Sequence, residues 1–537
     1  MNLLLNEPWI PVRRRDGSRE WIAPTRFSDT EIVAFDADRP DFNGALAQFA
    51  IGLLQTTTPA DSASQWRKLL ATPPNAASLA EWFAPVLKAF EFDGAGARFM
   101  QDFTLKADDG TVNDIGALLI EMPGENALKN NSDHFVKRGQ AASLCPACAA
   151  TALQTLQLNA PSGGVGHRTG LRGGGPLTTL LVGQPPGGLW RDLWLNVQER
   201  SVFLASCGDA GKVGEHLRFP WLADMSAIQK ESGETAPAQV HPDHLFWAMP
   251  RRVRLDLDAV ASGQCSICGR ESDRLIRQYA TKNYGLNYKG AWNHPLSPYY
   301  EAKDGELPLH PQPGGLGYRH WLAWVLGQTS DKKKQRAARI VSHALDHRHS
   351  QLGGGLRLWA FGYDMDNMKA RCWYESVVPL YDLAECASGA LERIRDEVGL
   401  WLASADLAAS YLRGAVKDAW FSADARGDFS AVDAAFWSRT EDAFYRQLQA
   451  LIDRERQAIE RDALPARQAW HQVLLHTAER LFDGEFVGAG QVERQNPRRI
   501  AEAHTQLKRN LRGPKLLGAL GLPVPEKKPT KAARKAA

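Results

Sequence analysis

Cys145-Pro-Ala-Cys148 and Cys265-Ser-Ile-Cys268 are the stretches of sequence that decide how this chain folds. The two C-x-x-C knuckles hold four of the seven cysteines, and together they supply the thiolates of one tetrahedral zinc site. Four cysteine ligands fill the coordination sphere of zinc and leave no position for an activated water. Two unrelated reduced pairs, or a redox or disulfide role, are the alternatives. The knuckles therefore predict a structural metal that joins distant parts of the chain and takes no part in catalysis.

Length and composition are those of a globular protein with more than one domain. The chain has 537 residues, of which 44% are hydrophobic and 23% are charged. The apolar start is interrupted by Asn6, Glu7 and Pro8, and no later window is long and apolar enough to span a membrane. The cysteines outside the knuckles fit a reducing compartment. We therefore expect a cytoplasmic protein without a membrane segment, and the net charge of +3 neither requires nor excludes nucleic acid.

The pattern of hydrophobic residues changes near residue 380. Before it, short β-like runs such as 177–182 and 252–257 alternate with helical stretches, which predicts an α+β domain over residues 1–379. After it, strand signals end and four amphipathic segments predict a four-helix bundle over residues 380–515. Residues 516–537 are rich in Lys, Pro and Ala, and we expect a basic, disordered tail. The predicted fold class is α+β, with a large zinc-braced N-terminal mixed α/β domain followed by a C-terminal four-helix bundle.

A glycine-rich segment, Ser162-Gly-Gly-Val-Gly-His-Arg-Thr-Gly-Leu-Arg-Gly-Gly-Gly175, follows a predicted helix. Leu171 and Arg172 follow Gly170, where a P-loop needs Lys and then Ser or Thr. Thr169 stands where a dinucleotide-binding fingerprint needs glycine. What remains is a backbone that can adopt positive φ and approach a partner closely, flanked by His167, Arg168 and Arg172. This composition suits a nucleic-acid groove or a phosphate, and a flexible surface loop is the alternative.

A second candidate binding element is the predicted β-hairpin Phe361-Gly-Tyr-Asp-Met-Asp-Asn-Met-Lys-Ala-Arg-Cys-Trp373. Its tip presents Asp366, Asn367 and Lys369 to solvent, and Asn and Lys side chains donate to base edges and phosphates. A purely structural hairpin is the alternative. The sequence contains no H-E-x-x-H, G-x-S-x-G or carboxylate-rich metal motif, so we expect a protein that is not an enzyme.

Several motifs follow one another in a characteristic order. They are Asn2-Leu-Leu-Leu-Asn-Glu-Pro-Trp-Ile-Pro-Val12, the two knuckles, Thr169-Gly-Leu-Arg-Gly-Gly174, Trp292-Asn-His-Pro-Leu-Ser-Pro298 and the hairpin. With this set the chain resembles, from residue 2 to about residue 515, the CasA family, the large subunit of the type I-E CRISPR surveillance complex Cascade. The resemblance implies a non-catalytic subunit that recognises the protospacer-adjacent motif in double-stranded DNA, promotes duplex opening and recruits the CRISPR helicase-nuclease.

The resemblance also implies which residues contact DNA. The family has a glycine loop that enters the minor groove, a lysine finger after the second knuckle and a hairpin wedge that splays the strands. The matching positions in this chain are Gly163, Gly164, Gly166, Lys282, Asn283, Asp366 and Asn367, and Arg168 and Lys369 are added as basic residues of the same two elements. The finger is Lys282 or Asn283, because a gap-free count from Cys268 ends on the asparagine. At the wedge, Asn367 stands where the best-known relatives have glutamine.

The remaining implied contacts concern the complex itself. In the family, an aromatic residue before the first knuckle faces the guide RNA and the other Cascade subunits, and it matches Phe135, with Lys137 and Arg138 beside it. The implied cofactor is one structural Zn²⁺ held by the two knuckles. A zinc-containing DNA-processing enzyme, which needs an open metal site, and a purely architectural interaction protein are the alternative functions.

Overall fold

The computed structural model shows a chain that divides into two compact units. The N-terminal unit consists of Met1–Gln312, Lys332–Ala344 and Gly355–Pro379, and the C-terminal unit of Pro313–Asp331, Leu345–Gly354 and Leu380–Ala537. The linear division at residue 379 therefore misses two internal segments of the C-terminal unit, because long-range contacts decide where those segments pack. The structure describes residues 1–5, 7–106, 110–123, 128–130, 139–184, 187–207, 214–228, 232–303, 305–330, 333–348, 355–366, 369–381, 383, 386, 389–421, 427–459, 462–488 and 496–524.

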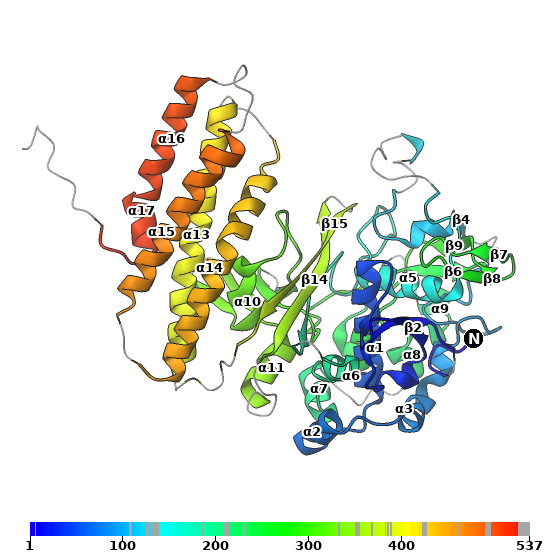
Figure 1. The fold of residues 1–537 in the computed structure, drawn as a ribbon. Coiled ribbons are helices and arrows are strands. Elements are labelled where there is room, and N and C mark those ends of the chain that lie inside the picture. The colour runs from blue at the N-terminus through cyan, green and yellow to red at the C-terminus, as the bar shows by residue number, and fades with distance from the viewer. Residues whose placement is uncertain are drawn as a thin grey trace, which may run out of the picture. The chain divides into compact units, whose positions relative to one another are not determined.

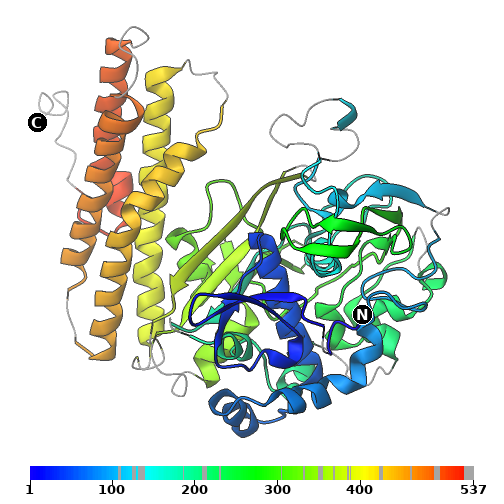
Figure 2. The same cartoon turned by 45° about the vertical axis from the view of Figure 1, so that its right-hand side comes forward.

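Short antiparallel strands form the sheets of the N-terminal unit (Figures 1 and 2). They are β1 (Ile10–Arg14), β2 (Arg19–Ile22), β3 (Ile32–Phe35), β4 (Thr111–Asp114), β5 (Thr178–Val182), β6 (Arg252–Leu255), β7 (Ala261–Gln264), β8 (Glu271–Leu275), β9 (Gln278–Lys282), β10 (Tyr299–Ala302), β11 (Gly305–Pro308), β13 (Lys333–Arg336), β14 (Arg357–Asp366) and β15 (Lys369–Pro379). The strand orders are β2-β1-β3, β15-β14-β5 and β4-β9-β6, and β7 pairs with β8. β10 pairs with both β11 and β13. The strands predicted near residues 180 and 254 and the predicted hairpin are confirmed.

Helix α1 (Pro40–Thr57) forms the centre of the N-terminal core. It carries one charged residue, near its start, and is therefore buried along nearly its whole length. Its Phe49 ring meets the rings of Phe90, Phe99 and Trp247 edge-on, with centroids 5.9 Å apart in each pair. The other helices that begin in this unit are α2 (Ala63–Ala71), α3 (Ala76–Phe83), α5 (Pro146–Asn159), α6 (Leu189–Trp194), α7 (Arg200–Cys207), α8 (Glu215–Arg218), α9 (Met225–Ile228) and α11 (Arg339–His347).

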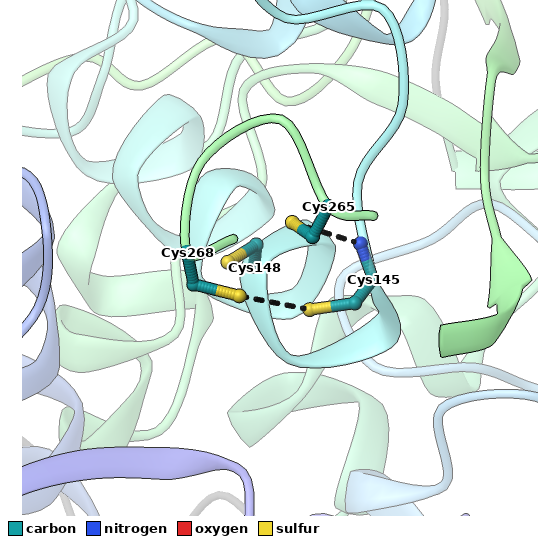
Figure 3. Close-up of side chains that lie close together, drawn as sticks. All are labelled: Cys145, Cys148, Cys265 and Cys268. Atoms are coloured by element: carbon teal, nitrogen blue, oxygen red, sulfur yellow. Dashed lines mark hydrogen bonds between the residues drawn. The ribbon is translucent and has the colours of Figure 1, made fainter. Parts of the chain in front are cut away.

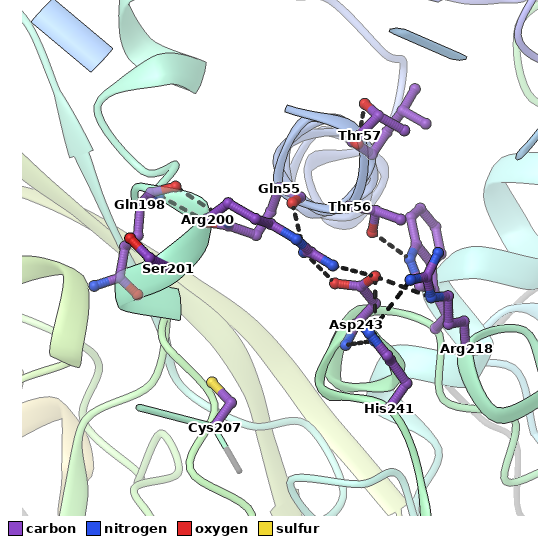
Figure 4. A network of polar contacts seen from close by, with 12 residues as sticks. Gln55, Thr56, Thr57, Gln198, Arg200, Ser201, Cys207, Arg218, His241 and Asp243 are labelled. Carbon is purple, nitrogen blue, oxygen red and sulfur yellow. Dashed lines mark hydrogen bonds and ion pairs between the residues drawn. The ribbon is translucent and has the colours of Figure 1, made fainter. Parts of the chain in front are cut away.

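A buried ion-pair network joins α1 to two later segments of the same unit (Figure 4). Its centre is Asp243, which is fully buried in the 3₁₀ helix η6 (Pro242–Phe246). The two carboxylate oxygens of Asp243 accept hydrogen bonds from Arg200 at 2.5 and 2.9 Å, and the same guanidinium donates to the Gln55 carbonyl of α1 at 3.0 Å. Because the buried charge is paired and hydrogen-bonded, it fixes the relative positions of these elements.

Long helices make up most of the C-terminal unit. Its elements are α10 (Trp321–Val325), β12 (Gln328–Ser330), α13 (Ala390–Trp420), α14 (Ser430–Arg456), α15 (Leu464–Leu481), α16 (Pro497–Leu511) and α17 (Pro514–Ala519). α13 contacts each of α14, α15, α16 and α17. The predicted helical spacing is confirmed, since Ile394, Val398 and Trp401 are all buried on α13. None of the helices in the described parts of the chain has an apolar stretch long enough to cross a membrane.

The internal segment 313–331 belongs to this helical unit because of one aromatic residue. The ring of Tyr318 stacks on Phe444 of α14 with centroids 4.4 Å apart. Its hydroxyl lies 2.8 Å from the hydroxyl of Thr440, one turn earlier on the same helix. Burial satisfied by a hydrogen bond is the usual arrangement of a core tyrosine, so this contact anchors the segment on α14.

The C-terminal end of the helical unit lies later than the sequence predicts. Helix α17 follows residue 513, and Leu516, Leu520 and Leu522 are buried. The boundary placed at residue 516 is therefore wrong, because the last leucines pack before the basic stretch begins. Residues 525–537, which hold most of the predicted tail, lie outside the described residues.

Candidate metal centre and nucleic-acid interface

The four knuckle cysteines come together in the N-terminal unit (Figure 3). Cys145 and Cys148 lie at the start of α5, and Cys265 and Cys268 lie in the turn between β7 and β8. All four Sγ atoms lie within 4.8 Å of one another, and those of Cys145 and Cys268 are 3.7 Å apart. A tetrahedral ion with metal–sulfur bonds of about 2.3 Å requires sulfur atoms about 3.8 Å apart. The cluster therefore has the donor set and the spacing of a structural metal site.

Backbone pairing holds the two knuckles together across the long gap in sequence. Leu144 and Ile276 exchange two backbone hydrogen bonds, of 2.9 and 2.8 Å, and the Ser266 amide donates to the Ser143 carbonyl at 2.9 Å. The Cys145 amide donates to the Cys265 sulfur at 3.3 Å. Hydrogen bonding from the Cys145 thiol lowers the pKa of Cys265, whereas hydrogen bonding with Cys145 raises the pKa of Cys148, so the four cysteines share protons when no metal binds them. These contacts bring together two knuckles that lie far apart in the sequence.

The glycine loop, residues 162–168, follows α5 and lies largely at the surface. Gly164 has φ +96°, and a Cβ atom there would meet no other atom within 4 Å. Gly166 has φ +77°, but a Cβ atom there would lie 2.6 Å from the Cβ of Asn283. The valine between them, Val165, is 77% exposed. The two glycines therefore differ: Gly164 faces open space, whereas Gly166 is needed for contact within the protein.

The segment after β9 is the partner of the glycine loop. The Asn283 side-chain amide donates to the Val165 carbonyl at 2.9 Å, and the Tyr284 backbone amide donates to the Gly166 carbonyl at 2.8 Å. Tyr284 has a positive φ of 65°, which marks a strained turn. The Arg168 guanidinium lies over the Tyr284 ring, 5.4 Å from its centroid. The structure thus brings the predicted glycine loop and the predicted finger segment into direct contact.

The two finger candidates have different surroundings. The Asn283 side-chain amide donates to the Val165 carbonyl of the glycine loop. Lys282, the last residue of β9, is exposed, and its ammonium forms no ion pair with any residue that the structure describes. Of the two side chains, Lys282 is the one available to an external partner.

Arg172, which the sequence suggests as a phosphate ligand, is a core residue. It is 3% exposed, and its guanidinium donates to the hydroxyls of Thr178 and Ser297 at 3.0 and 2.9 Å and to the Gln48 side-chain carbonyl. Burial lowers the pKa of Arg172 to about 10. That expectation is therefore wrong, because the arginine joins α1 to β5 inside the core.

The hairpin β14–β15 carries the predicted wedge residues at its tip. Asp366 and Lys369 are paired across the strands and exposed, whereas Asn367 lies outside the described residues. Asp364 is buried and not part of the tip, and Arg371 donates to it at 2.7 and 3.1 Å and to Asp366 at 3.4 Å. Arg371, which the sequence analysis did not single out, therefore compensates both carboxylates and stiffens the end of the hairpin.

The predicted guide-contacting residues, Phe135, Lys137 and Arg138, lie outside the described residues. Their role stays a prediction. Besides Arg371, the structure adds another residue that sequence reasoning missed, Arg251, whose guanidinium reaches both ends of the glycine loop. Nothing in its local sequence, Pro-Arg-Arg, separates it from an ordinary surface arginine.

Taken with this geometry, comparison with known proteins defines the class of the molecule. It is a mixed α/β protein with a helical C-terminal region, like the solved CasA structures. The family model of CRISPR-associated protein Cse1 matches residues 3–481. The chain belongs to the Cse1 family, also called CasA, and the resemblance inferred from the sequence motifs is confirmed.

Several solved structures share the fold over nearly the whole chain. Thermobifida fusca Cse1 is 16% identical, with 97% of this chain and 98% of that chain covered and a TM-score of 0.67. Thermus thermophilus CasA (Cse1) is 17% identical, with 95% and 99% covered and a TM-score of 0.64. A chain of a structure titled "CRISPR RNA-guided surveillance complex" is 16% identical, with 95% and 99% covered and a TM-score of 0.67. At these identities the likeness concerns the fold.

Proposed function

We propose that this chain is the subunit of a type I-E CRISPR surveillance complex, Cascade, that recognises the protospacer-adjacent motif in double-stranded DNA. Membership of the Cse1 family and the likeness to a chain of an RNA-guided surveillance complex support a place in such an assembly. The observation that carries the finer proposal is the contact between the exposed glycine loop and the turn that follows Lys282. Its partners are then the guide RNA, the other Cascade subunits, target DNA and the helicase-nuclease.

The glycine loop is suited to reading the minor groove. Because Gly164 has no Cβ and open space around it, its backbone can approach base edges closely. Guanine carries an exocyclic amino group in the minor groove, and this group would collide with such a close backbone. The ammonium of Lys282 lies at the end of the strand that leads into the loop's partner turn, where a phosphate or a base acceptor can meet it. The preference for a motif then arises from the shape of the minor groove and from the exclusion of the guanine amino group.

The hairpin supplies the step that opens the duplex. Asp366 and Lys369 near its end are exposed, and Arg371 donates to the carboxylates of Asp364 and Asp366, which stiffens the last described residues of β14 for insertion beside the motif. Base pairing with the guide RNA then reads the remaining sequence, as in other RNA-guided systems. The protein binds and positions DNA, and cleavage belongs to the recruited helicase-nuclease.

A structural Zn²⁺ fits the four-cysteine cluster. Cys145, Cys148, Cys265 and Cys268 would hold it, and the ion would supply a rigid cross-link between α5 and the β7–β8 turn. We further propose that α13 to α16 form a four-helix bundle that meets the small subunits and the displaced strand, and that the protein works in the cytoplasm.

The alternative of a zinc-containing DNA-processing enzyme has less support. Among the described residues, the one group of three or more His, Cys, Asp or Glu side chains close enough to share a metal is the four-cysteine cluster. Four thiolates leave no coordination position for a reactive water.

The test is motif selection by the assembled complex. Targets that match the guide but are randomised at the flanking base pairs are bound, and the retained motifs are sequenced. Gly164→Ala should reduce the preference for the selected motif at least about 10-fold, because the new Cβ obstructs the close approach. Gly17→Ala is the matched control, since Gly17 also has a positive φ, +86°, and no atom within 4 Å of its Cβ position. Unchanged selection by the Gly164 variant would contradict the proposal.

A further inference from the structure

One arginine connects the two ends of the glycine loop. The Arg251 Nη2 group donates to the carbonyl of Pro161, just before the loop, and its Nη1 group lies 2.5 Å from Nδ1 of His167 near the loop's end. The backbone of Arg251 is itself fixed: its amide donates to the Gln157 side-chain oxygen at 3.0 Å, and its carbonyl accepts from the Gln157 side-chain nitrogen at 2.9 Å. Arg251 is therefore anchored on α5 and spans the loop that follows α5.

The same edge of one sheet carries a second hold on the loop. Arg252 pairs with Lys282 in the β6–β9 ladder, so Arg251 and Asn283 each lie one residue beyond the same end of that ladder. Arg251 holds the ends of the loop, and Asn283 holds its tip through the Val165 carbonyl. The ladder fixes the spacing between these two side chains.

The chemistry of the contacts fits a fixed loop. A guanidinium has donors only and a planar fork, so it can bond two acceptors at once. For His167 Nδ1 to accept, the imidazole ring must be neutral with its proton on Nε2. Burial and the neighbouring Arg251 cation both lower the pKa of His167, which keeps the ring neutral at physiological pH.

We propose that Arg251 is a positioning residue that holds the glycine loop in the conformation that reads duplex DNA, and that Asn283 is a second clamp and not the DNA-contacting finger. This inference rests on the proposed function. It assigns Lys282 alone to the finger role and explains why Gly166 must be glycine, since a side chain there would push the loop away from Asn283. The loop is then a preformed reader, which avoids the cost of ordering it on DNA.

The first experiment compares Arg251→Met with Arg254→Met in the assembled complex. Arg254 is the matched control because it is an arginine of β6, the strand that follows Arg251 directly, and it donates to the Phe103 carbonyl at 2.8 Å, away from the loop. Arg251→Met should reduce the preference for motif over scrambled duplex about 10-fold to 100-fold, as expected for lost charge-assisted hydrogen bonds. Arg254→Met should leave the preference unchanged. An unchanged preference in Arg251→Met would overturn the proposal.

The salt dependence of binding separates positioning from direct contact. If Arg251 acts only through the loop, the slope of log K against log salt on scrambled duplex stays at the wild-type value. If Arg251 neutralises a phosphate itself, the slope falls by about 0.9, and the positioning role is wrong.

Hydrogen exchange on the free, full-length chain tests the clamp independently of DNA. The amides of His167 and Tyr284 are bonded to the Gly164 and Gly166 carbonyls at 3.2 and 2.8 Å. Both should exchange faster in Arg251→Met and in Asn283→Ala, and at the wild-type rate in Arg254→Met. Arg251→Lys keeps the charge but cannot bridge both acceptors, so the two amides should exchange at an intermediate rate. This variant replaces Arg251→Met in the test if the methionine variant is poorly folded.

The two proposals fail in different ways. If wild-type complex shows no motif preference, the proposed function is wrong, and the exchange rates still decide whether Arg251 holds the loop. If wild type selects a motif and exchange in the loop is the same in all variants, the clamp is wrong and the proposed function stands.

Discussion

Acid should destabilise the N-terminal unit through His241, a buried residue of the Asp243 network (Figure 4). Burial lowers the pKa of His241 from 6.5 to about 4, although the neighbouring Asp243 acts in the opposite direction. The unfolded chain therefore takes up a proton near pH 6.5, whereas the folded chain does so only near pH 4. The stabilisation is fully present above pH 6.5 and is lost as the pH falls through this window. Its full size is about 3 kcal/mol.

The variant His241→Asn isolates this effect. In the wild type, Nδ1 of His241 accepts the backbone amide of Asp243 at 3.1 Å and caps η6. The asparagine side-chain oxygen can accept the same amide but does not titrate. At pH 7.5 we expect the two proteins to differ by about 1 kcal/mol or less. Between pH 7.5 and 4.5, the variant should lose roughly 2 to 3 kcal/mol less stability than the wild type.

Urea unfolding followed by tryptophan fluorescence measures this difference, since Trp247 and Trp221 lie in the aromatic core of the same unit. The matched control is His216→Asn, which changes an exposed histidine of the same unit and should follow the wild-type pH profile. If His241→Asn loses as much free energy of unfolding on acidification as the wild type, the reasoning from burial is refuted.

Three further outcomes are expected. Elemental analysis should find about one zinc per chain, and Cys265→Ser should lower both the metal content and the melting temperature; a metal-free wild type of equal stability would exclude the zinc site. Replacing Arg499 and Arg509 of α16 by Gln should reduce the salt slope of DNA binding by about 2, whereas Arg498→Gln, whose arginine pairs with Glu502 at 2.9 Å, should change it less; equal slopes in all variants would identify an ordinary solvated face. Arg371→Leu should weaken binding to closed duplex more than to a target already opened as a bubble, and equal losses on both targets would contradict a wedge.

Most of what could be predicted from the sequence came from the periodicity of apolar residues and from the spacing of the cysteines. The buried positions of the long C-terminal helices follow the 3.6-residue period, because each helix packs one face against its neighbours. The cysteine knuckles were recognisable because thiolate pairs at this spacing have few other uses. Both signals are local, and each depends on residues within one or two turns of chain.

What could not be predicted depends on contacts between distant residues. No local pattern shows that Tyr318 packs on Phe444 and so transfers its segment to the helical unit. A gap-free count from the second knuckle could not separate Lys282 from Asn283, because the difference lies in which side chain bonds the Val165 carbonyl. Arg172 was misjudged for the same reason: its sequence neighbours are glycines, but its partners lie on other elements.

Helix α5 links the four-cysteine cluster to the glycine loop, and this arrangement gives the cluster a structural role in the proposed interface. The helix begins at the first knuckle and is 14 residues long, which corresponds to about 21 Å. Its last turn carries Gln157, which fixes the backbone of Arg251, and the glycine loop follows directly. A buried helix moves as a rigid body, so fixing its first turn to the β7–β8 turn also fixes the position from which the loop begins. Loss of the metal should therefore reduce motif preference together with stability, even though no cysteine lies within the loop.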